Sequence, residues 1–114
     1  MTADDPTVSD PQLYRVVWEN DAVRVLEYRY APGDQTHPHD HPNSVMVTLT
    51  SFRRRLTSGE HTADVTLTEG QAVWLDAQTH SGKNIGTTPT HTILVELKNT
   101  TTRTPGASPL GPSL

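Results

Sequence analysis

Residues 37–42 have the sequence HPHDHP, which places histidines at three alternate positions. In an extended chain, residues i and i+2 point to the same side, so His39 and His41 can direct two imidazoles to one point. A metal ion bound by histidine nitrogens at about 2.0–2.1 Å requires this arrangement. His37 could supply a third nitrogen. A solvent-exposed histidine-rich loop would have the same composition, so the run alone is a weak sign of a specific metal site.

A second segment strengthens the prediction of a metal site. His80 follows the sequence GQAVWLDAQT, residues 70–79, and Asn84 follows His80 by four residues. In the first segment, Gly33 precedes His39 with five residues between them. Two separate segments therefore each combine a glycine with one or two histidines at a definite spacing.

The residues around these segments predict β-strands. Short stretches rich in Val, Leu, Tyr, Trp and Thr alternate with Gly, Pro, Asn and Asp, which is typical of strands joined by turns. No stretch of useful length has apolar residues at helical spacing. The sequence therefore predicts an all-β sandwich or barrel. The strands are expected near residues 14–18, 23–30, 45–50, 52–56, 63–67, 72–75 and 92–97.

The composition favours one domain between two tails. A chain of 114 residues can bury one core. Residues 13–99 are assigned to the domain, residues 1–12 to a flexible tail, and the Thr-, Pro-, Gly- and Ser-rich residues 100–114 to a disordered tail. No apolar stretch is long enough to span a membrane, and the start of the chain lacks a secretory signal. We therefore expect a cytoplasmic protein without a membrane partner.

Charge and cysteine content exclude several classes of site. The chain has no Cys, so disulfides, thiolate catalysis and cysteine-bound metals are excluded, and imidazole and oxygen remain as metal ligands. Nine Lys and Arg against thirteen Asp and Glu give a net charge of −4, which argues against a nucleic-acid partner. A small-molecule ligand or substrate is the expected partner.

The two histidine segments resemble the two sequence motifs of the cupin superfamily, the RmlC-like proteins. The first motif begins with Gly, five residues and His-x-His, as Gly33, His39 and His41 do. The second has Gly, Pro-x-Gly, His and Asn; here Gly70 is followed by His80 one residue early. The resemblance covers about residues 14–98. It implies a double-stranded β-helix, or jelly-roll barrel, with a metal site and a homodimeric assembly.

One departure from the first motif changes the expected ligands. The motif continues with a Glu, but no Asp or Glu occurs between Asp40 and Glu60, and the expected positions hold Val45 or Met46. By resemblance to the three-His and four-His variants of the superfamily, the site is expected to use neutral nitrogen ligands. These ligands are His39, His41 and His80; His37 is either a fourth ligand, which we favour, or a residue that lines the cavity beside them. Such a site implies Fe, Mn, Ni, Cu or Zn, and its greater positive charge favours an anionic or enolisable substrate.

Four other residues are candidates for substrate binding. On a strand, alternation sends Arg54 to one face and its two neighbouring arginines to the other. A strand coated with charge is the preferred interpretation of this run, although Arg54 could hold a carboxylate with its two-pronged guanidinium. Gln78 and Met46 could line the cavity. His91 shares the parity of the apolar residues of the last strand, so it is expected to point inward, as a core or cavity-wall residue rather than a ligand.

Two functional classes remain open at this level. One is a metal-dependent enzyme, for which the resemblance implies oxidoreductases such as dioxygenases, isomerases or lyases. The other is a non-catalytic protein that binds or senses a small molecule in the same pocket. Three protein ligands leave coordination positions open for chemistry, so we expect an enzyme, with catalytic residues that the sequence does not identify. The strand at 14–18 is the expected dimer contact.

Overall fold

The computed structural model describes residues 4–98 and 110–113. Strands make up nearly all of its regular structure, which confirms the all-β prediction. The elements are, in chain order, α1 (Pro6–Ser9), β1 (Tyr14–Glu19), β2 (Val23–Tyr30), β3 (His39–His41), β4 (Ser44–Thr48), β5 (Phe52–Ser58), β6 (His61–Leu67), β7 (Ala72–Leu75), β8 (Gln78–Asn84), β9 (Thr90–Leu97) and β10 (Pro112–Ser113). The structure thus adds α1, β3, β8 and β10 to the seven strands that the sequence predicts.

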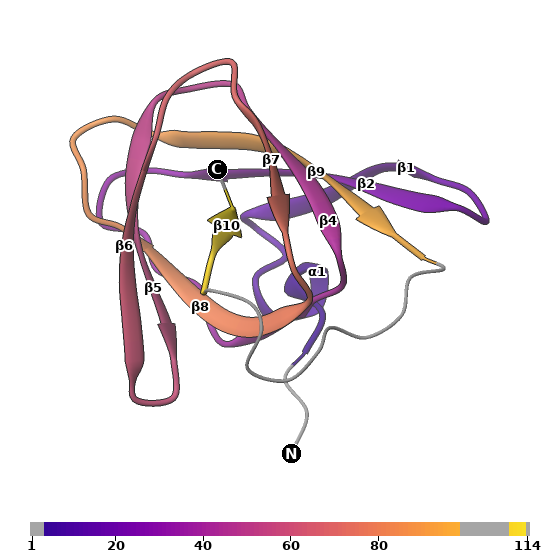
Figure 1. Ribbon diagram of the computed structural model, residues 1–114, viewed down its shortest axis with the longest axis horizontal. Helices are drawn as coiled ribbons and strands as arrows, with labels where there is room; N and C mark the ends of the chain where they lie inside the picture. The colour runs from indigo at the N-terminus through magenta and orange to yellow at the C-terminus, as the bar shows by residue number, and fades with distance from the viewer. Residues whose placement is uncertain (1–3, 99–109, 114) are drawn as a thin grey trace.

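The strands form two antiparallel sheets. One sheet has the order β1-β2-β9-β4-β7-β10, and the other has the order β3-β8-β5-β6. In Figure 1 the β1–β2 hairpin extends to the right and the β5–β6 hairpin extends to the lower left, beyond the strands that surround the interior. Within the first sheet, β2 pairs with β9, although the two strands are far apart in the sequence. Val23 lies opposite Leu97, and Tyr30 lies opposite Thr90.

The interior contains both apolar and polar side chains. A buried apolar cluster is built from both sheets and consists of Tyr14, Leu26, Tyr28, Tyr30, Met46, Phe52, Leu67, Val73, Leu75 and Leu94. Buried polar residues of the same strands include Thr48, Thr90, Thr92 and Glu96. A polar interior that is enclosed by strands provides a place for a site.

The orientation of β9 differs from the expectation. Its buried residues are Thr90, Thr92, Leu94 and Glu96, whereas the alternate residues, His91 among them, are only partly buried. The expectation that His91 points inward is therefore wrong. The reason is that the inward face of β9 is the more polar one, so apolar parity does not mark the interior on this strand.

The motif glycines occupy turns that favour glycine. Gly33 and Gly70 have φ values of +89° and +84°, in the left-handed region that side chains with a Cβ rarely adopt. Gly33 lies between β2 and β3, and Gly70 lies between β6 and β7. Each glycine therefore fixes a turn that precedes a strand.

The N-terminal segment packs against the domain from residue 4 onward, unlike the flexible tail expected for residues 1–12. Helix α1 is capped by Asp5, which accepts a hydrogen bond from the Thr7 amide, and Pro6 begins the helix. Asp10 is fully buried and accepts hydrogen bonds from the amide and the ring of His37. Residues 1–3 lie outside the described residues.

The C-terminal segment contributes a short strand. Residues 112 and 113 of β10 pair with Leu75 and Trp74 of β7, and the Gly111 amide donates to Gln78 Oε1 at 2.9 Å. This part of the expected tail is therefore attached to the sheet, while residues 100–109 and residue 114 lie outside the described residues. In the described part of the chain, no helix has the length and apolar character needed to cross a membrane.

Candidate metal centre

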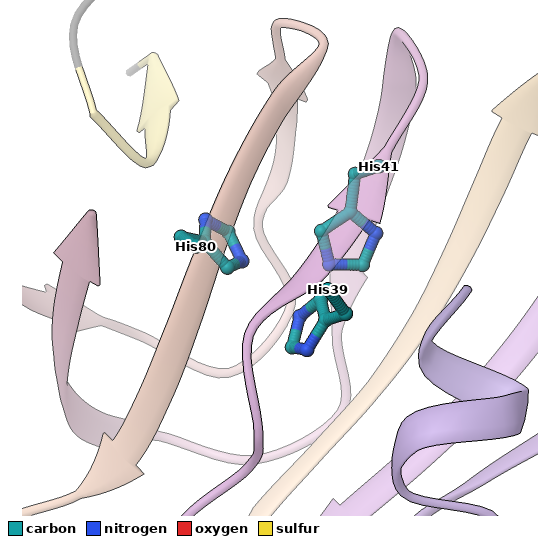
Figure 2. Close-up of side chains that lie close together, drawn as sticks. All are labelled: His39, His41 and His80. Carbon is teal, nitrogen blue, oxygen red and sulfur yellow. The ribbon is translucent and has the colours of Figure 1, made fainter. Parts of the chain in front are cut away.

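Strands β3 and β8 place three histidines side by side. His39 and His41 are alternate residues of β3 and share one face. His80 on β8 lies directly opposite His39 in the antiparallel pairing of the two strands. A cross-strand pair and an i, i+2 pair on the same face put the three imidazoles together, as Figure 2 shows.

The three rings form a compact and buried group. The ring centroids are 4.6 Å apart for His39 and His41, 5.1 Å for His39 and His80, and 5.0 Å for His41 and His80. One nitrogen from each ring lies within 4.8 Å of the other two. All three residues are buried, with at most 5% of their surface exposed. This is the three-histidine cluster that the sequence predicts.

Hydrogen bonds to Nδ1 orient two of the rings. His39 Nδ1 lies 2.8 Å from the His37 carbonyl oxygen, and His80 Nδ1 lies 2.8 Å from Gln78 Oε1. Both acceptors fix the proton on Nδ1 and leave the lone pair on Nε2. Both Nε2 atoms are buried and have no hydrogen-bond partner. Buried nitrogens without a partner, held in this tautomer, fit a metal ion.

The environment keeps the imidazoles of His39 and His80 neutral. Burial, followed by the neighbouring His41, lowers the pKa of His39 to about 3. The same two causes, in the same order, hold the pKa of His80 well below its usual value. Neutral imidazole is the form that binds a metal, so His39 and His80 need not lose a proton before binding near neutral pH.

A buried carboxylate lies behind His41, and the sequence analysis did not place it there. Glu96 Oε2 on β9 is 3.7 Å from His41 Nδ1, and both atoms are buried without a hydrogen-bond partner. Glu96 Oε1 accepts a hydrogen bond from Arg24 Nε at 2.7 Å. In Figure 2 one ring nitrogen of His41 faces the other two rings and the second faces away. Glu96 thus approaches the ring of His41 from outside the cluster.

The structure does not bring His37 to the cluster. Its side chain is 75% exposed, and its Nδ1 lies 3.0 Å from Asp10 Oδ1. Strand β3 begins only at His39, after Pro38, so the alternation of residues 39 and 41 does not extend back to residue 37. The backbone carbonyl of His37 contacts the site through His39 instead.

The four predicted substrate-binding residues have different positions. Gln78 contacts His80, and Met46 is buried in the apolar cluster, where its sulfur accepts a hydrogen bond from Tyr28. Arg54 is buried and its guanidinium carbon lies 4.8 Å from the ring centre of Tyr30. His91 lies on the other face of β9.

His91 forms a hydrogen bond with Glu27 on the outer face of the sheet. His91 Nε2 lies 2.7 Å from Glu27 Oε2, and the side chain of His91 is 21% exposed. This hydrogen bond, the largest cause, lowers the pKa of Glu27 to about 2. The pair is separate from the histidine cluster.

Tyrosines connect the histidine cluster with Arg54. The ring of Tyr14 lies edge-on to His39, with the centroids 5.5 Å apart, and its hydroxyl lies 2.5 Å from the hydroxyl of Tyr30. Arg54 Nη2 donates to the same Tyr30 hydroxyl at 3.2 Å. The tyrosines belong to β1 and β2, which the sequence predicts, but their contacts arise from pairings that a linear pattern does not contain.

Comparison with protein-family models finds no match, and comparison with curated proteins finds none either. Solved structures do match. A cupin domain from Bordetella pertussis Tohama I has a TM-score of 0.70 and 25% identity, over 86% of this chain and 98% of that chain. A double-stranded β-helix protein from Klebsiella pneumoniae has a TM-score of 0.60 and 20% identity, over 75% of each chain. The polyketide cyclase RemF from Streptomyces resistomycificus has a TM-score of 0.54 and 17% identity, over 74% of this chain and 63% of that chain.

Proposed function

Because this protein is a small chain with the cupin fold, a double-stranded β-helix, we propose that it is a metal-dependent enzyme. Its metal would be a divalent transition metal such as Fe, Mn, Ni, Cu or Zn, held by His39, His41 and His80. The observation that carries the proposal is that Nε2 of His39 and Nε2 of His80 are buried and without a hydrogen-bond partner. An apolar or hydrogen-bonded core would not leave two such atoms facing one point.

The ligand set supports chemistry on a small substrate. When bound, a divalent metal with three neutral protein ligands would supply Lewis acidity and open coordination positions. The protein's own residues keep His39 and His80 neutral, orient the rings of these two histidines through the His37 carbonyl and Gln78, and exclude water by burial. We place the reaction among those of dioxygenases, isomerases or lyases, with a small anionic or enolisable substrate. The likeness to a polyketide cyclase supports an enzyme of this fold.

A second candidate is a binding or sensing protein without catalysis. It is favoured by the composition of the cluster, which in the described part of the chain contains three histidines and no carboxylate. Glu96, the nearby acid, is already paired with Arg24. A general base is therefore not evident beside the histidines, and catalysis would depend on the metal and the substrate.

Metal analysis of the purified full-length protein tests the proposal. We expect about one divalent metal per chain after reconstitution. Replacement of His39, His41 or His80 with Ala should lower metal affinity by at least tenfold, the equivalent of about 1.4 kcal/mol. His61→Ala is the control, because His61 is exposed at the start of β6. Wild-type metal content in His80→Ala would disprove the proposed ligand set.

A second measurement separates the enzyme from the binding protein. The metal-free protein is loaded with Fe(II) under anaerobic conditions and mixed with oxygen and a set of enolic carboxylic acids. Oxygen uptake or product formation that is lost in His80→Ala supports an enzyme. Tight substrate binding with no turnover for any loaded metal supports the non-catalytic alternative.

A further inference from the structure

Three consecutive arginines on β5 occupy opposite environments. Arg53 and Arg55 are exposed, and Arg55 forms a two-pronged ion pair with Asp64 on the neighbouring strand, at 2.8 and 3.1 Å. Arg54 is only 6% exposed and is the one buried Lys or Arg in the described part of the chain. The inward position of Arg54 therefore cannot be explained as charge on a solvent-facing strand.

Arg54 has few partners for a buried cation. Its Nη2 and Nη1 donate long hydrogen bonds to the hydroxyls of Tyr30 and Tyr28, at 3.2 and 3.4 Å, and its Nε is buried with no partner. The guanidinium lies over the rings of the same two tyrosines. No Asp or Glu among residues 4–98 and 110–113 forms an ion pair with it. A guanidinium carries five N–H donors, and the acceptors that Arg54 contacts in the described part of the chain are neutral tyrosine hydroxyls.

The neighbouring tyrosines do not supply the missing negative charge. A tyrosine hydroxyl ordinarily ionises only near pH 10, and burial raises the pKa of Tyr30 to about 12. The tyrosines beside Arg54 therefore contribute hydroxyl groups and no negative charge near pH 7. The hydroxyls of Tyr14 and Tyr30 share one hydrogen bond of 2.5 Å, so one of the two protons is not used in it. Arg54, Tyr14 and Tyr30 therefore form a group with several hydrogen-bond donors and no negatively charged hydrogen-bond acceptor.

Gly82 shows that the guanidinium is held close to the strand that carries His80. A Cβ built on Gly82 would lie 2.0 Å from Arg54 Nη2 and 2.9 Å from its Cζ, so the guanidinium occupies the space that a side chain would fill. Gly82 and His80 are alternate residues of β8, both buried, about 7 Å apart along the strand. The guanidinium of Arg54 therefore lies against the same face of β8 that carries His80.

We propose that Arg54, with the Tyr14–Tyr30 hydroxyl pair, binds the carboxylate of a small organic acid whose other end reaches the three histidines. A carboxylate matches the planar guanidinium in shape and carries the single negative charge that one cation balances. It can also accept a hydrogen bond from the tyrosine hydroxyl whose proton is not used between Tyr14 and Tyr30. A phosphate would bring more charge than this single buried cation balances. The inference deepens the proposed function by naming the substrate class. It rests on that function only for what happens at the three histidines, where the other end of the acid would lie.

The test uses the full-length, metal-free protein, so that its outcome does not depend on the metal site. Propionate and propionamide serve as probes because they differ in charge and have nearly the same shape. The readout is the Nε–H resonance of Arg54 in nitrogen–proton correlation spectra, at constant ionic strength. We expect propionate to shift this resonance saturably and propionamide to have at least tenfold weaker affinity. Equal effects of the two probes, or an equal saturable effect of chloride, would overturn the proposal.

Three variants make the test specific, with propionate affinity measured for each by calorimetry. Arg54→Met and Gly82→Ala should each weaken binding at least tenfold, the first by removing the charge and the second by displacing the guanidinium. Arg53→Gln, at the exposed neighbouring position, should leave affinity unchanged. Wild-type affinity in Arg54→Met would overturn the assignment.

The stability of Arg54→Met distinguishes a binding role from a structural one. Met has a similar reach and no charge, so removal of an unpaired buried cation should leave the urea midpoint unchanged or raise it. A lower midpoint would mean that Arg54 stabilises the fold, and it would count against the proposal. Failure of metal binding, measured separately, would contradict the proposed function without affecting propionate binding.

Discussion

Two histidines only two positions apart have different roles in this protein. The side chain of His39 is fully buried in the cluster, whereas the side chain of His37 is exposed and contacts Asp10. The reason is the backbone conformation, because β3, which directs the side chains of residues 39 and 41 to one face, does not include residue 37. His37 acts on the site through its carbonyl oxygen, which any residue at this position would provide.

His37→Ala should therefore leave metal affinity within about twofold of wild type, because the substitution keeps the carbonyl that orients His39. Competition with a chelating dye measures this affinity. The stability of the protein should fall slightly through the lost contact with Asp10. A tenfold loss of affinity would mean that His37 is a fourth ligand, as the sequence suggested.

Glu96→Gln should weaken metal binding by about 10–100-fold, the range typical of carboxylates that support a histidine ligand. The physical reason is the approach of Glu96 Oε2 to His41 Nδ1, where a negative charge favours the metal-bound imidazole. Gln retains an oxygen for Arg24, so the fold should be kept. Glu27→Gln is the matched control, since Glu27 pairs with His91 on the outer face. Equal affinities for both variants would contradict the supporting role.

At the scale of elements, the strands that can be predicted are those whose residue pattern lies within one segment of the sequence. Strands such as β2 and β5 have apolar and β-branched residues within one segment, and the spacing of His39 and His41 follows from strand geometry. Strand β8 has the polar sequence QTHSGKN and was missed, because its formation depends on pairing with β3 and β5. The inward face of β9 was assigned wrongly for a similar reason. Which face is inside depends on what the barrel encloses, and here it encloses polar groups.

The N-terminal segment gives a prediction at this scale. Asp10→Ala should lower the free energy of unfolding by about 1–3 kcal/mol, because the buried carboxylate of Asp10 no longer accepts the partly buried hydrogen bond from the His37 amide. Urea denaturation checks this. Asp64→Ala is the control, since the ion pair of Asp64 with Arg55 is exposed to solvent and contributes little to stability. Equal effects of the two substitutions would mean that the segment is not held by Asp10.

At the scale of the whole molecule, one edge of the larger sheet is uncovered. Strand β1 is first in the sheet order, and no described strand lies beyond it. Its outer residues include Trp18, which is 52% exposed, and Val17, which is 41% exposed. An open edge with exposed apolar side chains is a site for pairing with another chain.

We propose that the protein forms a homodimer through β1, as the sequence led us to expect. Light scattering at micromolar concentration should give twice the mass of the chain. Trp18→Lys should shift the protein towards the monomer, because it places a charge in the contact. Val8→Lys, at an exposed apolar residue of α1, should not. A wild-type monomer would contradict the proposal.

The buried histidines also predict how stability depends on pH in the metal-free protein. The folded protein holds the pKa of His39 at about 3, whereas the unfolded chain binds this proton near pH 6.5. Between these values the unfolded state carries more protons, so the free energy of unfolding falls as the pH falls from 6.5 towards 3. The lowered pKa of His80 changes the free energy of unfolding with pH in the same direction.

Urea denaturation between pH 7 and 5 measures this effect, above the ordinary pKa range of carboxyl groups. The loss should reach at most about 1.4 kcal/mol per pH unit for each histidine. His80→Asn should have a shallower pH dependence than the wild type. A flat wild-type profile in this range would contradict the neutral state of the buried histidines.

The pairing of β2 with β9 has a consequence for how the chain is made. A ribosome adds about 5–20 residues per second, so roughly 3–12 s separate the synthesis of Tyr30 from that of its partner Thr90. During this interval β2 lacks its neighbour on one edge, and His39 and His41 exist without Glu96. The nascent chain must therefore avoid pairing with other nascent chains before the barrel can close. Yield during expression should depend on the rate of translation and on chaperones that cover strand edges.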